Sequence, residues 1–301
     1  MAIHNYFFGR EHDDPMRSGA RYWYVGNGRL KGATEAGARL YLGPELEVGG
    51  FPTSSDAIRA SDYVDEVLGR WCVCKSDASV SRGFEIVFDP MTLKAFMAIR
   101  PLIEQVLTEL ERRGGHSHDT DFCGLHVHTS RIAYGNDDDA RLLAFGKLMT
   151  LTERFQAEFS AIARRDTTQS QWCRPTGYGH AMDDGSRAIR RKAKAVLQSQ
   201  GAIDDEGHYV SLHDGRRYHI WNFQNKPTVE CRAFRGTLKA STLFATLAWV
   251  DGLVRWCTQH TTPETHAIGF ADLIAWIGND DLTAYVAERR RYVGRMTAYA
   301  A

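Results

Sequence analysis

Two glutamates on one predicted strand are the first candidates for chemistry. Residues 39–49, RLYLGPELEVG, alternate apolar and polar side chains between glycines, which is typical of a half-buried strand. Side chains two positions apart share one face of a strand, so Glu45 and Glu47 point the same way. Their like charges repel unless water or cations lie between them. Taken alone, the pair is explained by an exposed sheet face, and a cation site is the functional alternative.

A second predicted strand carries two histidines. In CGLHVHTS, residues 123–130, the side chains of His126, His128 and Ser130 share one face of the strand. Two imidazoles therefore point the same way at a separation that suits metal ligation. Core or surface histidines explain such a pair equally well, so a metal site is again one of two interpretations.

Two more carboxylates lie in otherwise apolar strands. Glu85 is in the middle of GFEIVFDP, where a charge needs a partner. Glu230 and Arg232 share a face of the strand predicted at 228–234, and Arg235 follows; a surface ion pair is the simpler explanation there. Placing all these groups within apolar strands is costly unless they converge on metal ions. A carboxylate-rich set with one imidazole suits Mg²⁺ or Mn²⁺ bound to phosphate better than structural zinc.

The elements that carry these residues indicate an α+β protein with an antiparallel or mixed sheet. Strands are predicted at residues 39–49, 71–73, 84–88, 122–132, 209–213, 217–223 and 228–234, the last three as a meander. Helices are predicted at residues 57–68 and 93–110, after Asn136, at 186–198 and over most of the chain from Lys239 onward. Pro44 lacks a backbone N–H, which indicates an edge strand or a bulge just before Glu45.

The chain is expected to comprise an irregular arm and one catalytic domain. Residues 1–39 mix aromatic side chains with glycine and arginine and show no sustained periodicity. Residues 40–301 form the single domain, with a helical C-terminal part. Within it, residues 166–185 are rich in Gly, Thr, Gln and Asp, which predicts a mobile loop of the kind that covers a site.

Composition restricts the partners. The 301 residues include 37 Lys and Arg against 37 Asp and Glu, so no net charge attracts nucleic acid or an acidic membrane. No stretch is long and apolar enough to cross a bilayer, and the first residues lack the pattern of a secretion signal. The six cysteines are scattered, which favours reduced, buried thiols. We expect a cytoplasmic protein that binds neither nucleic acid nor membrane, with its oligomeric state left open.

The order of these motifs resembles the carboxylate–amine ligase superfamily of glutamine synthetase and glutamate–cysteine ligase. Within it, the chain is most similar to the amidoligase family, whose pattern is a GxELE strand, DxS followed by GxEIV, a CGxHVH strand and a NF…VExRxFxGTL strand. The likeness runs from about Leu42 to Leu238. It implies a glutamine synthetase-like catalytic fold, with a curved, mostly antiparallel sheet flanked by helices.

The resemblance also implies roles for individual residues. Two or three Mg²⁺ (or Mn²⁺) ions would be held by five side chains: Glu45, Glu47, Glu85, His126 and Glu230. ATP would be bound by His128, Ser130, Asn222 and Arg232. The catalytic group facing the phosphates would be Glu230, Arg232 and Arg235. The pocket of the acceptor substrate would be bordered by Lys75, Asp77 and Ser79.

The implied activity is ATP-dependent amide or peptide bond formation through an acyl phosphate. The substrates would be small-molecule or peptide carboxylates and amines of open identity. A metal-dependent hydrolase could instead use His126 and His128 with a water nucleophile. The cupin-type Glu that follows HxH is absent, however, since Arg131-Ile132-Ala133 stands there. A catalytically silent binding or structural protein with the same fold is the third alternative.

Overall fold

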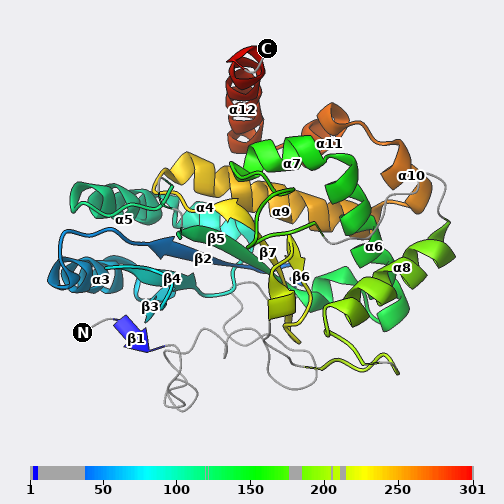
Figure 1. Ribbon diagram of the computed structural model, residues 1–301, viewed down its shortest axis with the longest axis horizontal. Coiled ribbons are helices and arrows are strands. Elements are labelled where there is room, and N and C mark those ends of the chain that lie inside the picture. The colour runs from blue at the N-terminus through cyan, green and yellow to red at the C-terminus, as the bar shows by residue number, and fades with distance from the viewer. Residues whose placement is uncertain are drawn as a thin grey trace. The chain divides into compact units, whose positions relative to one another are not determined.

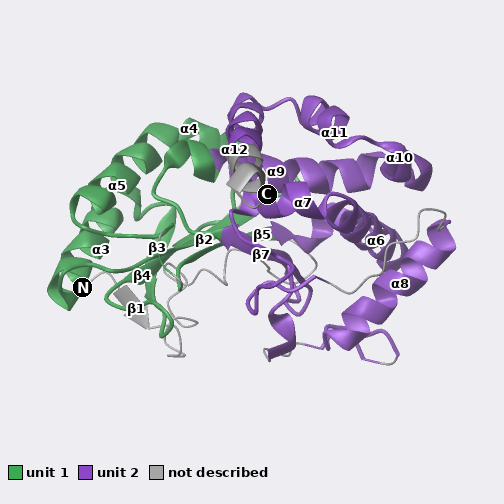
Figure 2. Cartoon of the chain, turned by 45° about the horizontal axis from the view of Figure 1, so that its top comes forward, with its two compact units in different colours: residues 1–128, 235–243 green, residues 129–234, 244–301 purple. Residues whose placement is uncertain are grey.

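The structure is a computed structural model, and Figure 1 shows its elements along the chain. It describes residues 3–5, 38–118, 120, 122–175, 185–204, 206–210 and 215–299, and side chains within these ranges except at 3–5 and 292–299. The chain divides into two compact units (Figure 2). Unit 1 comprises residues 1–128 and 235–243, and unit 2 comprises residues 129–234 and 244–301.

Unit 1 is built on a sheet with the strand order β1-β3-β4-β2-β5. Its strands are β1 (Ile3–Asn5), β2 (Leu42–Val48), β3 (Cys72–Ser76), β4 (Phe84–Phe88) and β5 (Gly124–Ser130), the last of which continues into unit 2. Strand β4 pairs antiparallel with both β3 and β2, and β1 pairs parallel with β3. The chain is therefore an α+β protein with a mostly antiparallel sheet, as the sequence predicts.

The register of β2, β3 and β4 separates an apolar face from a charged face. Leu46 pairs with Ile86, and both are fully buried. The helices α3 (Ser54–Leu68), α4 (Leu93–Ala98) and α5 (Arg100–Arg112) lie on one side of this sheet (Figure 2). Phe88, two residues after Ile86, meets Phe96 of α4 with the ring centroids 5.8 Å apart. The apolar side chains thus face the helices, and alternation puts the strand carboxylates on the opposite face.

Pro44 lies in a central strand, and the bulge beside it is in the partner segment. Strand β2 lies between β4 and β5, so it is a central strand of unit 1. Glu45 pairs with Val87, whereas the isolated bridge on the other side of Pro44 joins Leu42 to Met91. Two residues of β2 lie between these points and three residues of the partner segment, so the extra residue of this β-bulge is among residues 88–90 and not at Pro44.

Two helix predictions differ in outcome. The helix predicted at 57–68 is confirmed as α3, which begins earlier because Thr53 and Asp56 form a reciprocal capping box. The single helix predicted at 93–110 is wrong, because α4 ends at Ala98 and α5 begins at Arg100. Pro101 explains the break: at the start of α5 it cannot donate the backbone hydrogen bond to the carbonyl four residues earlier that would continue α4.

Unit 2 is largely helical. Its elements are the 3₁₀ turns η1 (Arg131–Tyr134) and η2 (Gly215–Arg217), strands β6 (Trp221–Asn222) and β7 (Thr228–Arg235), and helices α6 (Asp138–Arg154), α7 (Gln156–Ala163), α8 (Ser186–Ser199), α9 (Ala240–Gln259), α10 (Thr262–Ala267), α11 (Phe270–Ile277) and α12 (Asp280–Tyr299). Phe159 is at the centre of an aromatic core, since its ring contacts those of Trp221, Phe234 and Trp249. This core packs α7 and α9 against β6 and β7. The predicted strand at 228–234 and helices at 186–198 and beyond Lys239 are confirmed.

Of the three strands predicted as a meander over residues 209–234, the structure describes the full range of the last two, 217–223 and 228–234. Strand β7 pairs antiparallel with β6, which has only two residues. Tyr209 makes an isolated bridge to Ile203, and residues 211–214 lie outside the described residues. Of the second predicted strand, residues 217–223, only Trp221–Asn222 forms a strand, and Gly215–Arg217 before it forms a 3₁₀ turn.

Two predictions on chain organisation stay predictions. The arm at residues 1–39 lies outside the described residues except for β1 and residues 38–39, and nothing tests whether residues 40–301 act as one domain. The loop predicted at 166–185 is described only up to residue 175 and again at residue 185.

Among the helices that the structure describes, none is both long and apolar enough to span a lipid bilayer.

Candidate active site

Strand pairing in unit 1 gathers carboxylates around Glu85. Glu85 is opposite Glu47 on one side and opposite Lys75 on the other. Only 2% of Glu85, 5% of Glu47 and 7% of Lys75 is exposed. Residues paired across neighbouring strands have their side chains on the same face, about 5 Å apart. Two buried carboxylates and one buried ammonium group therefore share a short row across β2, β4 and β3.

Two sets of side chains in unit 1 can each hold a cation. In the first, Glu45, Glu85 and His126 each place one ligand atom within 4.8 Å of the others. In the second, Glu47, Asp77 and Glu85 do the same. We call these five residues the Glu85 cluster. Because carboxylate oxygens predominate, the donor set suits a hard divalent ion such as Mg²⁺ or Mn²⁺.

The electrostatics of Glu85 fit such an ion. Its Oε2 atom is buried and accepts no hydrogen bond from any described residue. Burial raises the pKa of the Glu85 carboxyl well above its ordinary value, and the nearby carboxylates raise it further, while Lys75 acts in the opposite direction. A buried acceptor without a donor and a surplus of negative charge are both relieved by a bound cation.

Backbone and loop contacts hold Glu47 in place. The amide of Gly124 donates to Glu47 Oε2 over 2.5 Å, and Ser117 Oγ donates to the Glu47 carbonyl over 2.7 Å. A Cβ atom at position 124 would come within 3.1 Å of His126 Nε2, so glycine there allows the close approach. The start of β5 thus positions both a carboxylate and an imidazole of the Glu85 cluster.

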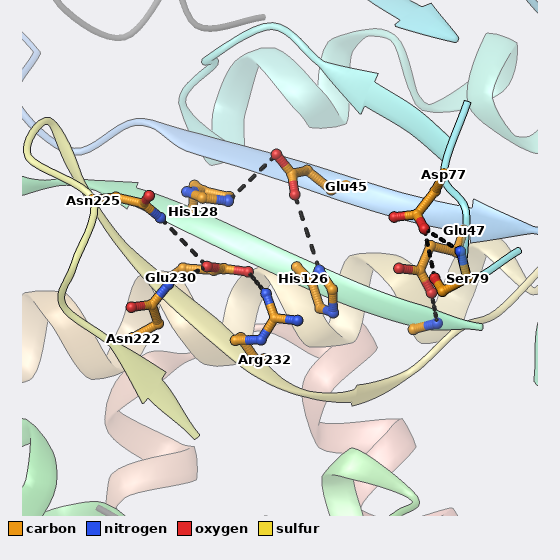
Figure 3. Close-up of polar contacts among 11 residues, drawn as sticks. Glu45, Glu47, Asp77, Ser79, His126, His128, Asn222, Asn225, Glu230 and Arg232 are labelled. Atoms are coloured by element: carbon orange, nitrogen blue, oxygen red, sulfur yellow. Dashed lines mark hydrogen bonds and ion pairs between the residues drawn. The ribbon is translucent and has the colours of Figure 1, made fainter. Parts of the chain in front are cut away.

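Both histidines of the HxH run approach one carboxylate. His128 Nε2 lies 3.4 Å from Glu45 Oε1, and His126 Nδ1 lies 3.9 Å from Glu45 Oε2 (Figure 3). The side chains of all three are between 11% and 16% exposed. Glu45 of the ExE strand and both histidines of the HxH strand therefore lie on one face. Each imidazole is close enough to Glu45 to orient its carboxylate.

The DxS segment is divided between two environments. Asp77 Oδ1 accepts hydrogen bonds from Ser79, over 2.7 Å from its amide and over 2.6 Å from its hydroxyl, which closes an Asx turn (Figure 3). Ser79 is exposed, whereas Asp77 contributes to the Glu85 cluster and Lys75 lies beside Glu85. The family resemblance assigned all three to the acceptor pocket. The hairpin β3–β4 puts Asp77 near Glu85, a proximity that motif spacing alone did not reveal.

In unit 2 a single buried carboxylate is surrounded by donors. Asn222 lies opposite Glu230 in the β6–β7 pair, and its Nδ2 donates to Glu230 Oε2 over 2.7 Å. Asn225 Nδ2 donates to the same oxygen over 3.4 Å, and Arg232 Nη1 forms a short ion pair with Glu230 Oε1 (Figure 3). Only 3% of Glu230 is exposed. We call these four residues the Glu230 cluster.

Arg131 fixes the loop between β6 and β7 and was not among the sequence candidates. Its guanidinium donates to four backbone carbonyl oxygens over 2.7–3.1 Å, at residues Phe223, Asn225, Lys226 and Thr228. Its carbon Cζ also lies 4.3 Å from the centroid of the Tyr209 ring. Burial lowers the pKa of Arg131. The only signal in the sequence is an arginine directly after a buried strand, and its partners are about a hundred residues away along the chain.

Two further predicted site residues, Ser130 and Arg235, lie at the ends of strands. Ser130 is fully buried at the end of β5, and Arg235 is the half-buried last residue of β7. Their assignments to ATP and to the phosphates stay predictions, as do those of His128, Asn222 and Arg232.

Fold and site together define a class of protein. It is an α+β protein whose antiparallel strands carry a carboxylate-rich set of candidate ligands for a divalent cation. A family model described as "putative amidoligase enzyme" matches residues 62–254, and the chain belongs to this family. The match contains Glu85, His126 and Glu230 and begins after Glu45 and Glu47. No protein in the curated set matches the chain.

Proposed function

We propose that this protein is an ATP-dependent carboxylate–amine ligase that forms an amide or peptide bond through an acyl phosphate. The observation that carries the proposal is the Glu85 cluster: four carboxylates and an imidazole on one sheet face, with a buried oxygen of Glu85 left without a donor. A hydrophobic interior tolerates that arrangement when cations are bound. In this proposal, the cations would serve the phosphates of a nucleotide.

The reaction has two displacements. A substrate carboxylate oxygen attacks the γ-phosphorus of ATP, the bond to the β,γ-bridging oxygen breaks, and ADP leaves. An amine nitrogen then attacks the carbonyl carbon of the acyl phosphate, the carbon–oxygen bond to phosphate breaks, and the nitrogen loses a proton. Catalysis of phosphoryl transfer comes mainly from positioning and from neutralising charge on the phosphoryl oxygens.

The chain's own residues supply binding and orientation. Glu45, Glu47, Glu85, His126 and Glu230 would hold Mg²⁺ or Mn²⁺, which supplies charge neutralisation on the phosphate oxygens. Arg232 offers a planar, two-pronged contact to a phosphoryl group, which lysine does not reproduce. Its ion pair with Glu230 restrains the guanidinium in the structure. Asp77 joins the expected ligands because it shares a ligand set with Glu47 and Glu85.

The expected substrates are small-molecule or peptide carboxylates and amines, and the expected location is the cytoplasm. Support for the location is limited to the thiols: all six cysteines are free and buried, which suits a reducing compartment. Burial raises the pKa of Cys257 to about 12, so that thiol stays protonated and unreactive at neutral pH.

The test measures phosphate release from Mg²⁺-ATP with a panel of amino-acid and short-peptide carboxylates. Hydroxylamine serves as a general amine, because it converts an acyl phosphate to a hydroxamate that is detected directly. We expect hydroxamate and phosphate in equal amounts from the wild-type protein. Glu47→Ala and Glu230→Ala should each lower the rate by about 10²–10³-fold, the usual loss when one group that stabilises charge in the transition state is removed.

Circular dichroism of both variants checks that they remain folded. Undiminished turnover in both folded variants would refute the assignment of these carboxylates. Phosphate release that needs no carboxylate substrate and yields no hydroxamate would favour the hydrolase instead. Calorimetry that detects no binding of Mg²⁺-ATP to the wild-type protein would favour a catalytically silent protein.

A further inference from the structure

Trp172 is an exposed indole that the proposed mechanism does not use. It is 44% exposed, the largest exposed fraction of any large apolar side chain that the structure describes. Exposing an indole forgoes the favourable burial of a large apolar surface. A single exposed apolar residue is ordinary on a protein surface, so the surroundings of Trp172 decide whether it has a use.

The segment that presents Trp172 is held by the backbone. The amide of Arg174 donates to the Tyr218 carbonyl over 3.0 Å, and the amide of Ile220 donates to the Arg174 carbonyl over 2.8 Å. His219 Nδ1 lies 2.9 Å from the carbonyl oxygen of Pro175. These contacts join residues 174–175 to residues 218–220 and anchor the chain directly after Trp172.

Trp172 and Tyr218 form an aromatic platform. Their rings meet edge to face with centroids 5.4 Å apart. The guanidinium carbon of Arg217 lies 5.2 Å from the Tyr218 centroid, and that of Arg232 lies 5.5 Å from it. The amide of Arg232 donates to the Ile220 carbonyl over 2.9 Å, which ties the platform to β7. An exposed indole is thus connected through one ring to the arginine expected at the phosphates.

The charge around the platform favours an anionic ligand. Arg232 has Glu230 as its partner, whereas Arg217 has no carboxylate partner in the part of the chain that the structure describes. The polar contact of Arg217 is with the Tyr218 hydroxyl, over 3.4 Å. The charge of Arg232 is balanced by Glu230, so the guanidinium of Arg217 is the one that leaves a positive charge beside the aromatic surface. A ligand with a flat ring at one end and phosphates at the other satisfies both features.

We propose that the adenine ring of ATP stacks on the exposed face of Trp172, which Tyr218 supports edge to face, while Arg232 faces the phosphates. The inference rests on the proposed function, which supplies ATP as the ligand. Stacking on an aromatic side chain recognises the face of a base and holds it without reading its hydrogen-bonding edge. The platform therefore orients the nucleotide, and Trp172 acts as a positioning residue.

The test compares ATP with inorganic tripolyphosphate, which has the phosphate chain and no base. Calorimetry on the full-length chain with Mg²⁺ measures the Kd of each ligand. Trp172→Ala should weaken ATP binding about tenfold, a typical loss for one base stacked on an aromatic ring, and leave the Kd of tripolyphosphate unchanged. Trp172→Phe should restore most of the affinity for ATP. Met97→Ala, a change at another exposed apolar residue on α4, should alter neither Kd.

The outcomes separate this inference from the function on which it rests. If the wild-type protein binds tripolyphosphate and ATP but Trp172→Ala weakens both equally or neither, the platform does not hold adenine. If Trp172→Ala raises the KM of the carboxylate or amine and leaves the Kd of ATP unchanged, the platform belongs to the acceptor and the inference is wrong. If the wild-type protein binds neither ligand, the proposed function fails and the adenine assignment fails with it.

Discussion

The two buried carboxylate clusters of this protein differ in how their negative charge is balanced. In the Glu85 cluster, four carboxylates share one sheet face, Lys75 is the buried cation beside Glu85, and Glu85 Oε2 has no donor among the described residues. In the Glu230 cluster, one carboxylate receives two amide groups and a guanidinium. The first cluster has surplus negative charge, and the second is neutralised by the chain itself.

The difference indicates that one cluster is suited to bind cations and the other to orient its partners. Surplus negative charge in a buried site attracts divalent cations and is unfavourable without them. A saturated carboxylate is stable by itself and fixes the direction of its partners, here Arg232 and Asn222. A metal-ligand role for Glu230 requires a cation to share oxygens that already accept hydrogen bonds, which a carboxylate with about four lone-pair sites allows.

The largest effect is expected from removing the cation of the Glu230 cluster. Arg232→Met should lower the free energy of unfolding of the metal-free protein by about 3–5 kcal/mol, because it leaves a buried carboxylate without its cation. The side chains of Glu230 and Arg232 are only 4% and 12% exposed, so water cannot replace the lost partner. Urea denaturation measures the change.

The control removes a comparable pair at the surface. Arg59→Met deletes the partner of Asp56 on α3, where the arginine side chain is 63% exposed. We expect its free energy of unfolding to stay close to that of the wild-type protein. Equal effects of the two substitutions would show that Glu230 does not depend on Arg232.

The next effect is the stabilisation of the folded protein by cations bound to the Glu85 cluster. Adding Mg²⁺ or Mn²⁺ to the metal-free protein should raise the free energy of unfolding by about 2.7 kcal/mol at a hundredfold excess over Kd. Glu85→Gln should remove most of this stabilisation, since Glu85 belongs to both candidate ligand sets. Thermal unfolding with and without the metal provides the measurement. Glu66→Gln, an exposed change on α3, is the control, and the same metal effect in Glu66→Gln and Glu85→Gln would contradict the cluster's role.

The smallest effect is a pH dependence of opposite sign at two glutamates. The pKa of Glu85 is raised by burial and by its acidic neighbours, so the folded state holds a proton that the unfolded state loses above about pH 4.5. The metal-free protein should therefore lose stability as the pH rises from 4.5 through the raised pKa. Glu85→Gln should lack this decline and be more stable at neutral pH by about 1–3 kcal/mol.

Glu109 on α5 gives the contrasting case. Hydrogen bonds from Arg112 and Arg113 lower the pKa of Glu109 to about 2. Its contribution to stability is present above about pH 4.5 and is lost as the pH falls toward 2, so Glu109→Gln should remove an acid-side decline. Urea denaturation between pH 3 and pH 8 tests both variants. A pH profile of Glu85→Gln that matches the wild-type profile would show that Glu85 ionises freely in the folded protein.

Much of the candidate site was predictable because alternation along a strand is local. The spacing of Glu45 and Glu47, and of His126 and His128, was sufficient to place each pair on one face, and the structure confirms that these pairs meet at Glu45. The α+β class followed from the same periodicities. The predictions that are wrong lie where local pattern is weak: the helix that breaks before Pro101, and the strand predicted at 217–223, of which only Trp221–Asn222 forms a strand.

The sequence by itself determined which side chains share a face of each strand, because the two-residue period of a strand is a property of the backbone. Only the tertiary structure decided which faces meet. The register of β4 between β2 and β3 puts Lys75 and Glu47 on either side of Glu85, and the β3–β4 hairpin brings Asp77 to the same cluster. Arg131 binds carbonyl groups 92 to 97 residues away along the chain. Such partners depend on packing between distant segments, which no local pattern encodes.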